Sequence, residues 1–259
     1  MSLQSPEGNH LLAALPESVR GRLFPHLESI QMLRGDDLYK SGKQLRYVYF
    51  PTTAIAALLC EIADGASTET AMVGKEGLLG VALFMGGGTT PGRAIVQCPG
   101  HGFLLKAQWL RDEFNLAGPL MHLFLHYTQA LITQMAQTAV CNRHHSLHQQ
   151  LCRWLLMSLD RLPSNELVMT HEGIASMLGV RREGITEAAG NLQDAGLIHY
   201  KRGHITILDR PALEAQSCEC YRVVKQEFDR LLPYPEEPKN LPATLKGGSV
   251  VLSMSQQFA

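Results

Sequence analysis

The stretch THEGIASMLGVRREGITEAAGNLQDAGLIHYKRGHITIL, residues 170–208, begins with a short helical pattern. Thr170 is placed to cap this helix, because a threonine hydroxyl can accept from an N–H of the first turn that has no partner inside the helix. Apolar residues then recur with the spacing of one helix face. Gly179 follows them and is typical of a helix end. The pattern predicts a helix of about two turns, since an α-helix has about 3.6 residues per turn.

A second helical pattern starts near Arg181 and ends at Gly196, and its apolar residues again share one face. Two short helices joined by a tight turn that contains glycine are typical of a helix-turn-helix. The segments LIHYK and HITIL then predict two strands, joined by a hairpin turn at Arg202-Gly203. The helix-turn-helix and the hairpin together predict a winged helix.

The second helix offers polar side chains away from its apolar face. In helix-turn-helix proteins, the first residues of this helix reach base edges in the major groove. Arginine can read guanine with two hydrogen bonds, and glutamate can accept from cytosine N4. The alternative is a solvated helix face that carries a local mixture of Arg and Glu. The predicted DNA-binding residues are Thr170, Arg181, Arg182, Glu183, Thr186, Glu187, Lys201 and Arg202.

This stretch resembles the C-terminal domain of the Crp–Fnr family of bacterial transcription regulators. The segment VGKEGLLGVALFMGGGTTPGRAIVQCPG, residues 73–100, resembles the nucleotide-pocket region of the family's N-terminal barrel. The segment CNRHHSLHQQLCRWLLMSLDRL, residues 141–162, resembles the part that joins the family's dimer helix to its DNA-binding domain. The resemblance implies a homodimer that binds a two-fold-symmetric operator in double-stranded DNA. It also implies RNA polymerase as a partner and a small-molecule effector.

The fold class predicted is α+β. Short strand patterns between residues 38 and 106 alternate with turn signals, which favours a β-sandwich or barrel. The resemblance makes this part a double-stranded β-helix, or jelly roll, within a sensor domain at 1–118. A dimerisation helix at 119–145 and a winged helix-turn-helix domain at 146–232 follow. The Pro- and Gly-rich end, 233–259, is predicted to be a disordered tail.

The long helix is expected to begin at Pro119, because proline is favoured in the first helical turn. Its apolar residues form two stripes, so it has two surfaces to bury. We expect one stripe to pack on the barrel and the other on the same helix of a second chain. The alternative is a fully buried core helix of a monomer. The first stripe contains Leu120, Phe124, Tyr127 and Leu131, and the second contains Leu125, Ile132, Met135 and Ala139.

Cyclic-nucleotide-binding relatives hold the ribose with a Glu that follows a Gly, and the phosphate with an Arg. In this sequence Gly80 and Val81 match the Gly-Glu position, and Val81 cannot accept a hydrogen bond from a ribose. Arg93, followed by Ala94, matches the phosphate-binding Arg. Half of the set is therefore present, and Arg93 could bind another anion or only form a salt bridge. The sequence predicts an effector other than cyclic AMP.

Oxygen-sensing relatives bind an iron–sulfur cluster through N-terminal cysteines, but no Cys precedes Cys60 here. No cofactor is predicted. Cys218 and Cys220 are two residues apart on a predicted helix, so we expect them to point to different faces. Three pairs have the i, i+4 spacing that suits a metal, but none has an evident third ligand. The sequence therefore predicts no metal site at His122–His126, His144–His148 or Cys141–His145.

The net charge of −1 does not indicate a nucleic-acid-binding protein. Between residues 141 and 210 there are eight Lys/Arg and seven Asp/Glu, so the DNA prediction depends on motif geometry and resemblance. No apolar run is long enough for a membrane span and no secretory signal is present, which favours the cytoplasm. No catalytic motif appears, so no enzyme activity is predicted. The alternative function is a sensor or interaction protein of the same fold without sequence-specific DNA binding, because Glu187 would repel phosphate.

Overall fold

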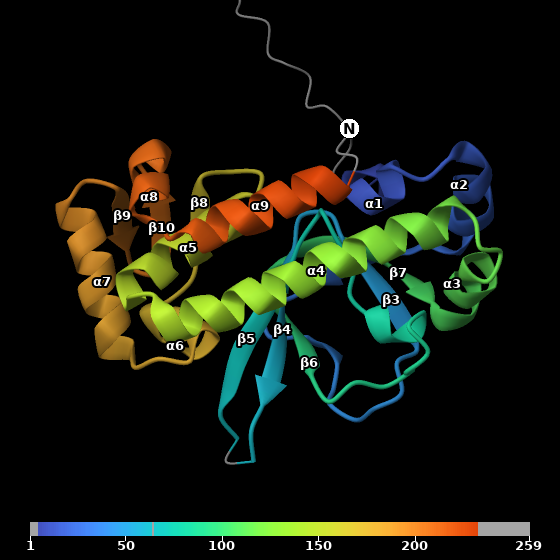
Figure 1. Ribbon diagram of the computed structural model, residues 1–259, viewed down its shortest axis with the longest axis horizontal. Coiled ribbons are helices and arrows are strands. Elements are labelled where there is room, and N and C mark those ends of the chain that lie inside the picture. Colours follow the sequence, from blue (N-terminus) through green and yellow to red (C-terminus); the bar gives the residue numbers. More distant parts are fainter. Residues whose placement is uncertain (1–4, 64, 233–259) are drawn as a thin grey trace, which may run out of the picture.

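The computed structural model of the chain describes residues 5–63 and 65–232. The predicted tail, 233–259, lies outside these described residues. Figure 1 shows the long helix α4 running along the molecule, with the N-terminal helices near one end and the winged helix near the other. In chain order the elements are η1 (Pro6–Gly8), α1 (His10–Ala13), α2 (Glu17–Leu23), η2 (Phe24–His26), β1 (Glu28–Met32), β2 (Asp37–Tyr39), β3 (Tyr47–Pro51), β4 (Ile55–Glu61), β5 (Ser67–Val73), η3 (Val81–Leu83), β6 (Arg93–Cys98), β7 (Gly100–Lys106), α3 (Ala107–Phe114), α4 (Pro119–His144), α5 (Leu147–Leu159), β8 (Glu166–Val168), α6 (His171–Leu178), α7 (Arg182–Asp194), β9 (Ile198–Lys201), β10 (His204–Ile207), α8 (Arg210–Gln216) and α9 (Glu219–Leu231).

The N-terminal strands form two antiparallel sheets, ordered β1-β7-β3 and β2-β6-β4-β5. Side chains alternate along a strand, so every second residue can enter the core. In β3, for example, Val48 and Phe50 are fully buried while Tyr47 and Tyr49 are half-buried. The buried faces of both sheets contribute to one continuous core. The predicted α+β fold, with an N-terminal jelly roll and a C-terminal winged helix-turn-helix, is confirmed.

Helix α4 begins at Pro119, as predicted. The first predicted stripe is buried in the core, with Phe124 and Tyr127 fully enclosed. The second stripe faces outward in the single chain except at Met135, which is half-buried and packs against the core. Leu125 is 41% exposed and Ile132 is 53% exposed, which is unusual for large apolar side chains on one helix face.

Helix α9 packs along α4, a contact that the sequence analysis did not predict (Figure 1). Tyr127 of α4 meets Phe228 of α9 edge to face, with ring centroids 6.5 Å apart. Three surfaces of α4 therefore have distinct surroundings: the barrel, α9 and solvent. Among the described residues, no helix is both long and apolar enough to cross a membrane.

Candidate nucleic-acid interface

Helix α6 has a defined cap at each end. The Thr170 hydroxyl accepts from the Gly173 N–H at 3.1 Å, so the predicted helix cap is present. Gly179 ends α6 with φ at 67°, in the left-handed region that favours glycine. A Cβ on Gly179 would lie 2.7 Å from Oγ1 of Thr68, because the turn packs against strand β5 of the barrel. The position therefore requires glycine on two counts.

Helix α7 has one buried face and one exposed face. Its core residues are those predicted from the spacing, Ile185, Ala188, Ala189 and Leu192. Five of the eight side chains predicted to contact DNA lie on the exposed part of α7 or at its N-cap: Arg181, Arg182, Glu183, Thr186 and Glu187. Arg181 is the N-cap residue and Arg182 the first helical residue, so both cations lie at the start of the helix. In helix-turn-helix proteins, this end of the second helix reaches the bases.

A contact that the sequence analysis missed joins α6, α7 and the wing. The ring of His171, at the start of α6, stacks on Tyr200 of β9 with centroids 4.1 Å apart. Nδ1 of His171 lies 3.0 Å from Oγ1 of Thr186, and that hydroxyl donates to the Arg182 carbonyl. Burial lowers the pKa of His171, and the nearby Arg182 lowers it further. Through these contacts His171 positions the first turn of α7 relative to the wing.

The predicted hairpin is present, with β9 and β10 paired from His204↔Lys201 to Ile207↔Ile198. Its two turn residues, Arg202 and Gly203, have φ of 50° and 85°. Two consecutive positive φ angles are typical of a type I′ turn, which matches the twist of the strands. Lys201 and Arg202 are exposed. A third strand, β8, pairs with β10 and was not predicted.

The start of α7 and the hairpin carry four cations. Within residues 5–63 and 65–232, Arg181, Arg182, Lys201 and Arg202 form no ion pair, and each is exposed. Free guanidinium and ammonium groups can bind phosphate and release its counterions. These four cations can therefore attract an anion, although Glu183 and Glu187 on the same exposed part of α7 offset some of their charge.

Buried polar contacts connect the barrel to the segment that precedes the winged helix. Nε of Arg161, just after α5, lies 2.7 Å from Oε1 of Glu76 in the barrel, and Nη2 of Arg161 donates to Gln134 of α4 at 3.0 Å. Glu69 of β5 is also buried at this junction, and burial raises its pKa to about 7 although Arg153 acts in the opposite direction. A shift of the barrel relative to α4 and α5 would disturb all of these contacts.

The predicted effector residues lie in the barrel. Gly80 has φ of 111° and precedes η3, and Val81 is the first residue of η3. Ala94 is buried in the core. Arg93 is held by two carboxylates: Nη1 lies 2.6 Å from Oε1 of Glu61, and Nε lies 3.7 Å from Oδ1 of Asp37. An anionic ligand would have to compete with both of these acidic groups.

The predicted orientation of Cys218 and Cys220 is wrong. Helix α9 starts at Glu219, so Cys218 is its N-cap and has extended backbone angles, φ −80° and ψ 165°. The two thiols can therefore approach each other. They lie together with Cys141 and His145, and one ligand atom from each of the four residues is within 4.8 Å of the others.

The C-terminal part of the chain matches a known protein family. Residues 149–216, which include α6, α7 and the hairpin, match the Crp-like helix-turn-helix domain. Among curated proteins, none has a sequence that matches the chain significantly.

Solved structures share the fold over most of the chain. FixK2 from Bradyrhizobium japonicum has a TM-score of 0.65 at 15% identity, covering 74% of this chain and 98% of FixK2. A CRP-family transcriptional regulator from Thermus thermophilus has a TM-score of 0.61 at 18% identity, covering 73% of this chain and 96% of the regulator. The c-di-GMP responsive regulator CLP from Xanthomonas campestris has a TM-score of 0.60 at 14% identity, covering 75% of this chain and 100% of CLP. The chain thus contains a Crp-like helix-turn-helix domain at residues 149–216 and shares the fold of these three proteins.

Proposed function

We propose that this chain, which has the fold and the helix-turn-helix domain of the Crp–Fnr family, regulates transcription as a homodimer bound to a two-fold-symmetric operator. The observation that supports this most directly is the exposed, unpaired start of α7, with Arg181 and Arg182 beside Glu183. The contacts of His171 fix this start relative to the wing. A positioned recognition helix is what base readout requires.

The side chains divide into two proposed roles. Arg182 and Glu183 would read bases, as the first helical residues of the recognition helix. Arg202 and Lys201 at the hairpin would bind phosphates, because the wing carries two exposed cations and no base-reading acid. Glu187 lies one turn after Glu183 in α7. If the first turn of α7 enters the major groove, Glu187 would not contact the phosphates.

The dimer would form through the exposed stripe of α4. Exposed residues recur every seven positions along this stripe, at Leu125, Ile132 and Ala139. Between them lie Gln129 and Ala136, which complete the spacing of a coiled-coil seam. Two such stripes facing each other would remove large apolar side chains from water. A two-fold-symmetric dimer would present two α7 helices to half-sites about 34–36 Å apart.

The effector would be a small molecule other than cyclic AMP. CLP from Xanthomonas campestris is described as responsive to c-di-GMP, so one protein of this fold responds to a different nucleotide. In this chain, Val81 lacks the acceptor for a ribose and Arg93 is already paired with Glu61 and Asp37. Ligand-driven movement of the barrel could reach the winged helix through Glu76 and Arg161.

The remaining expectations follow from this function. We propose that residues 1–118 form the sensor domain, 119–145 the dimerisation helix and 146–232 the DNA-binding domain. We also propose that the protein acts in the cytoplasm, with RNA polymerase as a partner and without enzymatic activity. These assignments are supported by the element order and by the structural relatives, which include transcriptional regulators.

Selection of bound fragments from genomic DNA, followed by titration at several salt concentrations, tests the proposal. Specific binding should enrich a symmetric motif, and log Kd should change linearly with log salt. Arg46→Ala is a matched control, because Arg46 is an exposed arginine of the barrel remote from α7. Binding without any enriched motif would favour the alternative, an interaction protein of this fold that does not recognise a DNA sequence.

A further inference from the structure

Three cysteines and a histidine from two distant parts of the chain meet where α4 ends and α9 begins. Cys141 lies in the last turn of α4, and His145 is the residue that caps this helix. Cys218 is the N-cap of α9, and Cys220 lies in its first turn. The three cysteines are buried and form a cluster of their own, separate from the aliphatic core. Thiols packed against one another in this way need an explanation other than hydrophobic burial.

The spacing of the four side chains suits a single ion. Sγ of Cys141 lies 3.5 Å from Sγ of Cys218, and Sγ of Cys220 lies 3.6 Å from Nδ1 of His145. Zinc with tetrahedral bonds of about 2.3 Å holds neighbouring sulfur ligands about 3.8 Å apart. All four ligand atoms fall within 4.8 Å of one another. An iron–sulfur cluster would need its ligands further apart, because the irons and sulfides occupy the space between them.

His145 also lies next to a carboxylate, as metal-bound imidazoles in proteins commonly do. Its Nε2 lies 3.4 Å from Oε1 of Glu219, while Nδ1 faces the thiols. A carboxylate that accepts the Nε2–H fixes the tautomer that leaves Nδ1 free to bind a metal. Glu219 itself is exposed, so it is an outer partner of His145 and not a buried ligand.

We propose that Cys141, His145, Cys218 and Cys220 form a tetrahedral zinc site that fastens the start of α9 to the end of α4. Thiolate and imidazole are the ligands of structural zinc sites, and four protein ligands leave no open position for catalysis. The metal would fix the end of the proposed dimerisation helix at the point where the chain turns into α5. The site does not depend on the DNA-binding proposal, since it uses none of those residues.

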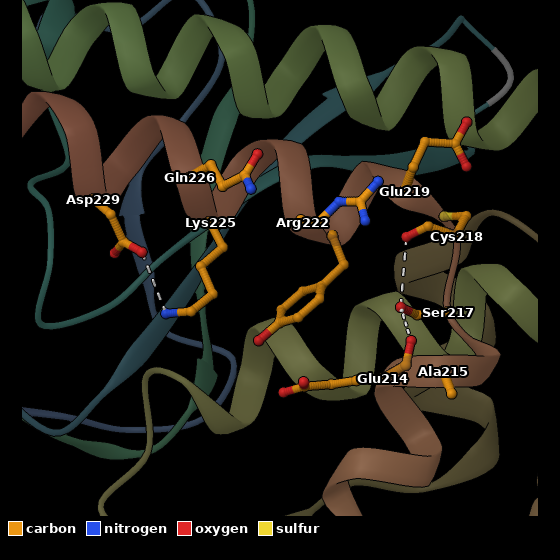
Figure 2. Close-up of a pocket in the computed structure, with 10 residues that line it drawn as sticks. Glu214, Ala215, Ser217, Cys218, Glu219, Arg222, Lys225, Gln226 and Asp229 are labelled. Atoms are coloured by element: carbon orange, nitrogen blue, oxygen red, sulfur yellow. Dashed lines mark hydrogen bonds and ion pairs between the residues drawn. The ribbon is translucent and has the colours of Figure 1, made fainter.

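An entry path for the ion is present beside the site. Cys218 and Glu219 line one end of an open groove of about 570 Å³ that continues along α9 (Figure 2). Lys225 and Asp229 pair across 3.7 Å at the other end of this groove. Cys218 thus lies at the edge of this groove although the residue is buried.

The first test measures metal in the purified full-length protein, isolated under reducing conditions. We expect one zinc per chain and no iron or acid-labile sulfide. After zinc is removed with a chelator, Co²⁺ should give the absorption of a tetrahedral thiolate complex, and added ZnCl₂ should displace it. Chelation should lower Tm and ZnCl₂ should restore it, because a ligand that binds only the folded state stabilises it.

Variants locate the metal. Cys218→Ser and His145→Ala should lose the zinc, whereas the control Cys60→Ser, at an exposed cysteine of the barrel, should keep it. Glu219→Gln keeps all four ligands and should weaken zinc binding by about 10- to 100-fold. If a ligand variant fails to fold, the Co²⁺ titration of the unmutated protein still decides the question.

Three results would overturn the proposal. One is iron with sulfide in place of zinc. Another is a disulfide between Cys141 and Cys218 in protein prepared without oxidant, shown by mass spectrometry. The third is zinc retention that is equal in Cys218→Ser and Cys60→Ser, which would place the metal elsewhere.

Discussion

Arg161 and Glu76 form a buried ion pair, with Nε of the guanidinium 2.7 Å from Oε1 of the carboxylate. The two residues are 85 positions apart and belong to the segment after α5 and to the barrel. Their side chains are 6% and 9% exposed, so neither charge is solvated well by water. Gln134 of α4 and the Met157 carbonyl accept from the same guanidinium. The barrel, α4 and the approach to the winged helix are therefore joined at one arginine.

Removing one member of this pair should destabilise the protein strongly. Glu76→Ala leaves the Arg161 guanidinium buried without its counter-charge, which typically costs about 3–5 kcal/mol. Urea unfolding of the two proteins measures this difference. Arg230→Ala is the control, because the exposed Arg230–Glu227 pair should contribute only about 0–1 kcal/mol. Equal losses for the two variants would contradict the role given to the buried pair.

Glu69 should make the protein less stable as the pH rises, whereas most paired carboxylates in folded proteins make it more stable. Burial raises its pKa in the folded protein from 4.5 to about 7. Between these two values the folded state binds a proton that the unfolded state releases, so stability falls as the pH rises through this window. The total loss is about 3 kcal/mol.

The Glu69→Gln variant removes this contribution, since glutamine stays neutral. Relative to the unmutated protein, the variant should gain stability between about pH 5 and pH 7, as measured by urea unfolding, and the difference should level off above pH 7. Glu166→Gln, at an exposed glutamate, should show no such trend. A constant difference between Glu69→Gln and the unmutated protein across this range would show that Glu69 is ionised in the fold.

The helix-turn-helix could be predicted because its signals are local. A capping threonine, a glycine that ends a helix and apolar residues at helical spacing all lie within residues 170–196 and appear where expected. Strand β8 was missed because three residues carry no periodicity and the strand exists only through its pairing with β10. The Glu76–Arg161 pair and the thiol cluster were missed because they join segments more than 70 residues apart.

The error at Cys218 has a more specific cause. Helical spacing was applied to two residues that span a helix boundary, and an N-cap residue does not have helical angles. One shifted boundary changed the predicted side-chain direction. Three of the four residues predicted for the second stripe of α4, Leu125, Ile132 and Ala139, are exposed, because a long uninterrupted helix has no boundary to misplace. The fourth, Met135, is half-buried and packs against the core.

The exposed stripe of α4 should be the dimer seam. The protein should sediment as a dimer at micromolar concentration, and Ile132→Glu should shift it to monomer by placing two carboxylates in the seam. His126→Glu is the control, since His126 is exposed on the same helix but lies to the side of the stripe. A monomer of unmutated protein under these conditions would contradict the proposed interface.

Arg182 and Arg202 should differ in how they affect DNA binding. Arg182→Ala should weaken binding to the operator by about 1–3 kcal/mol and relax specificity at one base pair, because a base contact is lost. Arg202→Ala should weaken binding to all sequences alike and reduce the salt slope by about 1. Titration of the operator and of single-base variants distinguishes the two effects. Uniform weakening by Arg182→Ala would make Arg182 a phosphate contact.

Cyclic AMP should bind the barrel poorly. Val81 stands where relatives place the ribose-binding Glu, so a ribose hydroxyl would face an apolar side chain. An unpaired hydroxyl of this kind costs about 1–3 kcal/mol, or roughly ten- to hundred-fold in affinity. The cyclic phosphate meets a second obstacle, because Arg93 is held 2.6 Å from Glu61 and a negative ligand would have to displace that carboxylate.

Isothermal titration with cyclic AMP and cyclic GMP measures the affinity of the barrel for both nucleotides directly. Glu61→Gln removes one of the two carboxylates that pair with the Arg93 guanidinium and should improve any residual anion binding. Arg93→Ala should abolish that anion binding. A low-micromolar Kd for cyclic AMP that Arg93→Ala removes would mean that another acceptor replaces the missing Glu and that the barrel is a cyclic-nucleotide sensor after all.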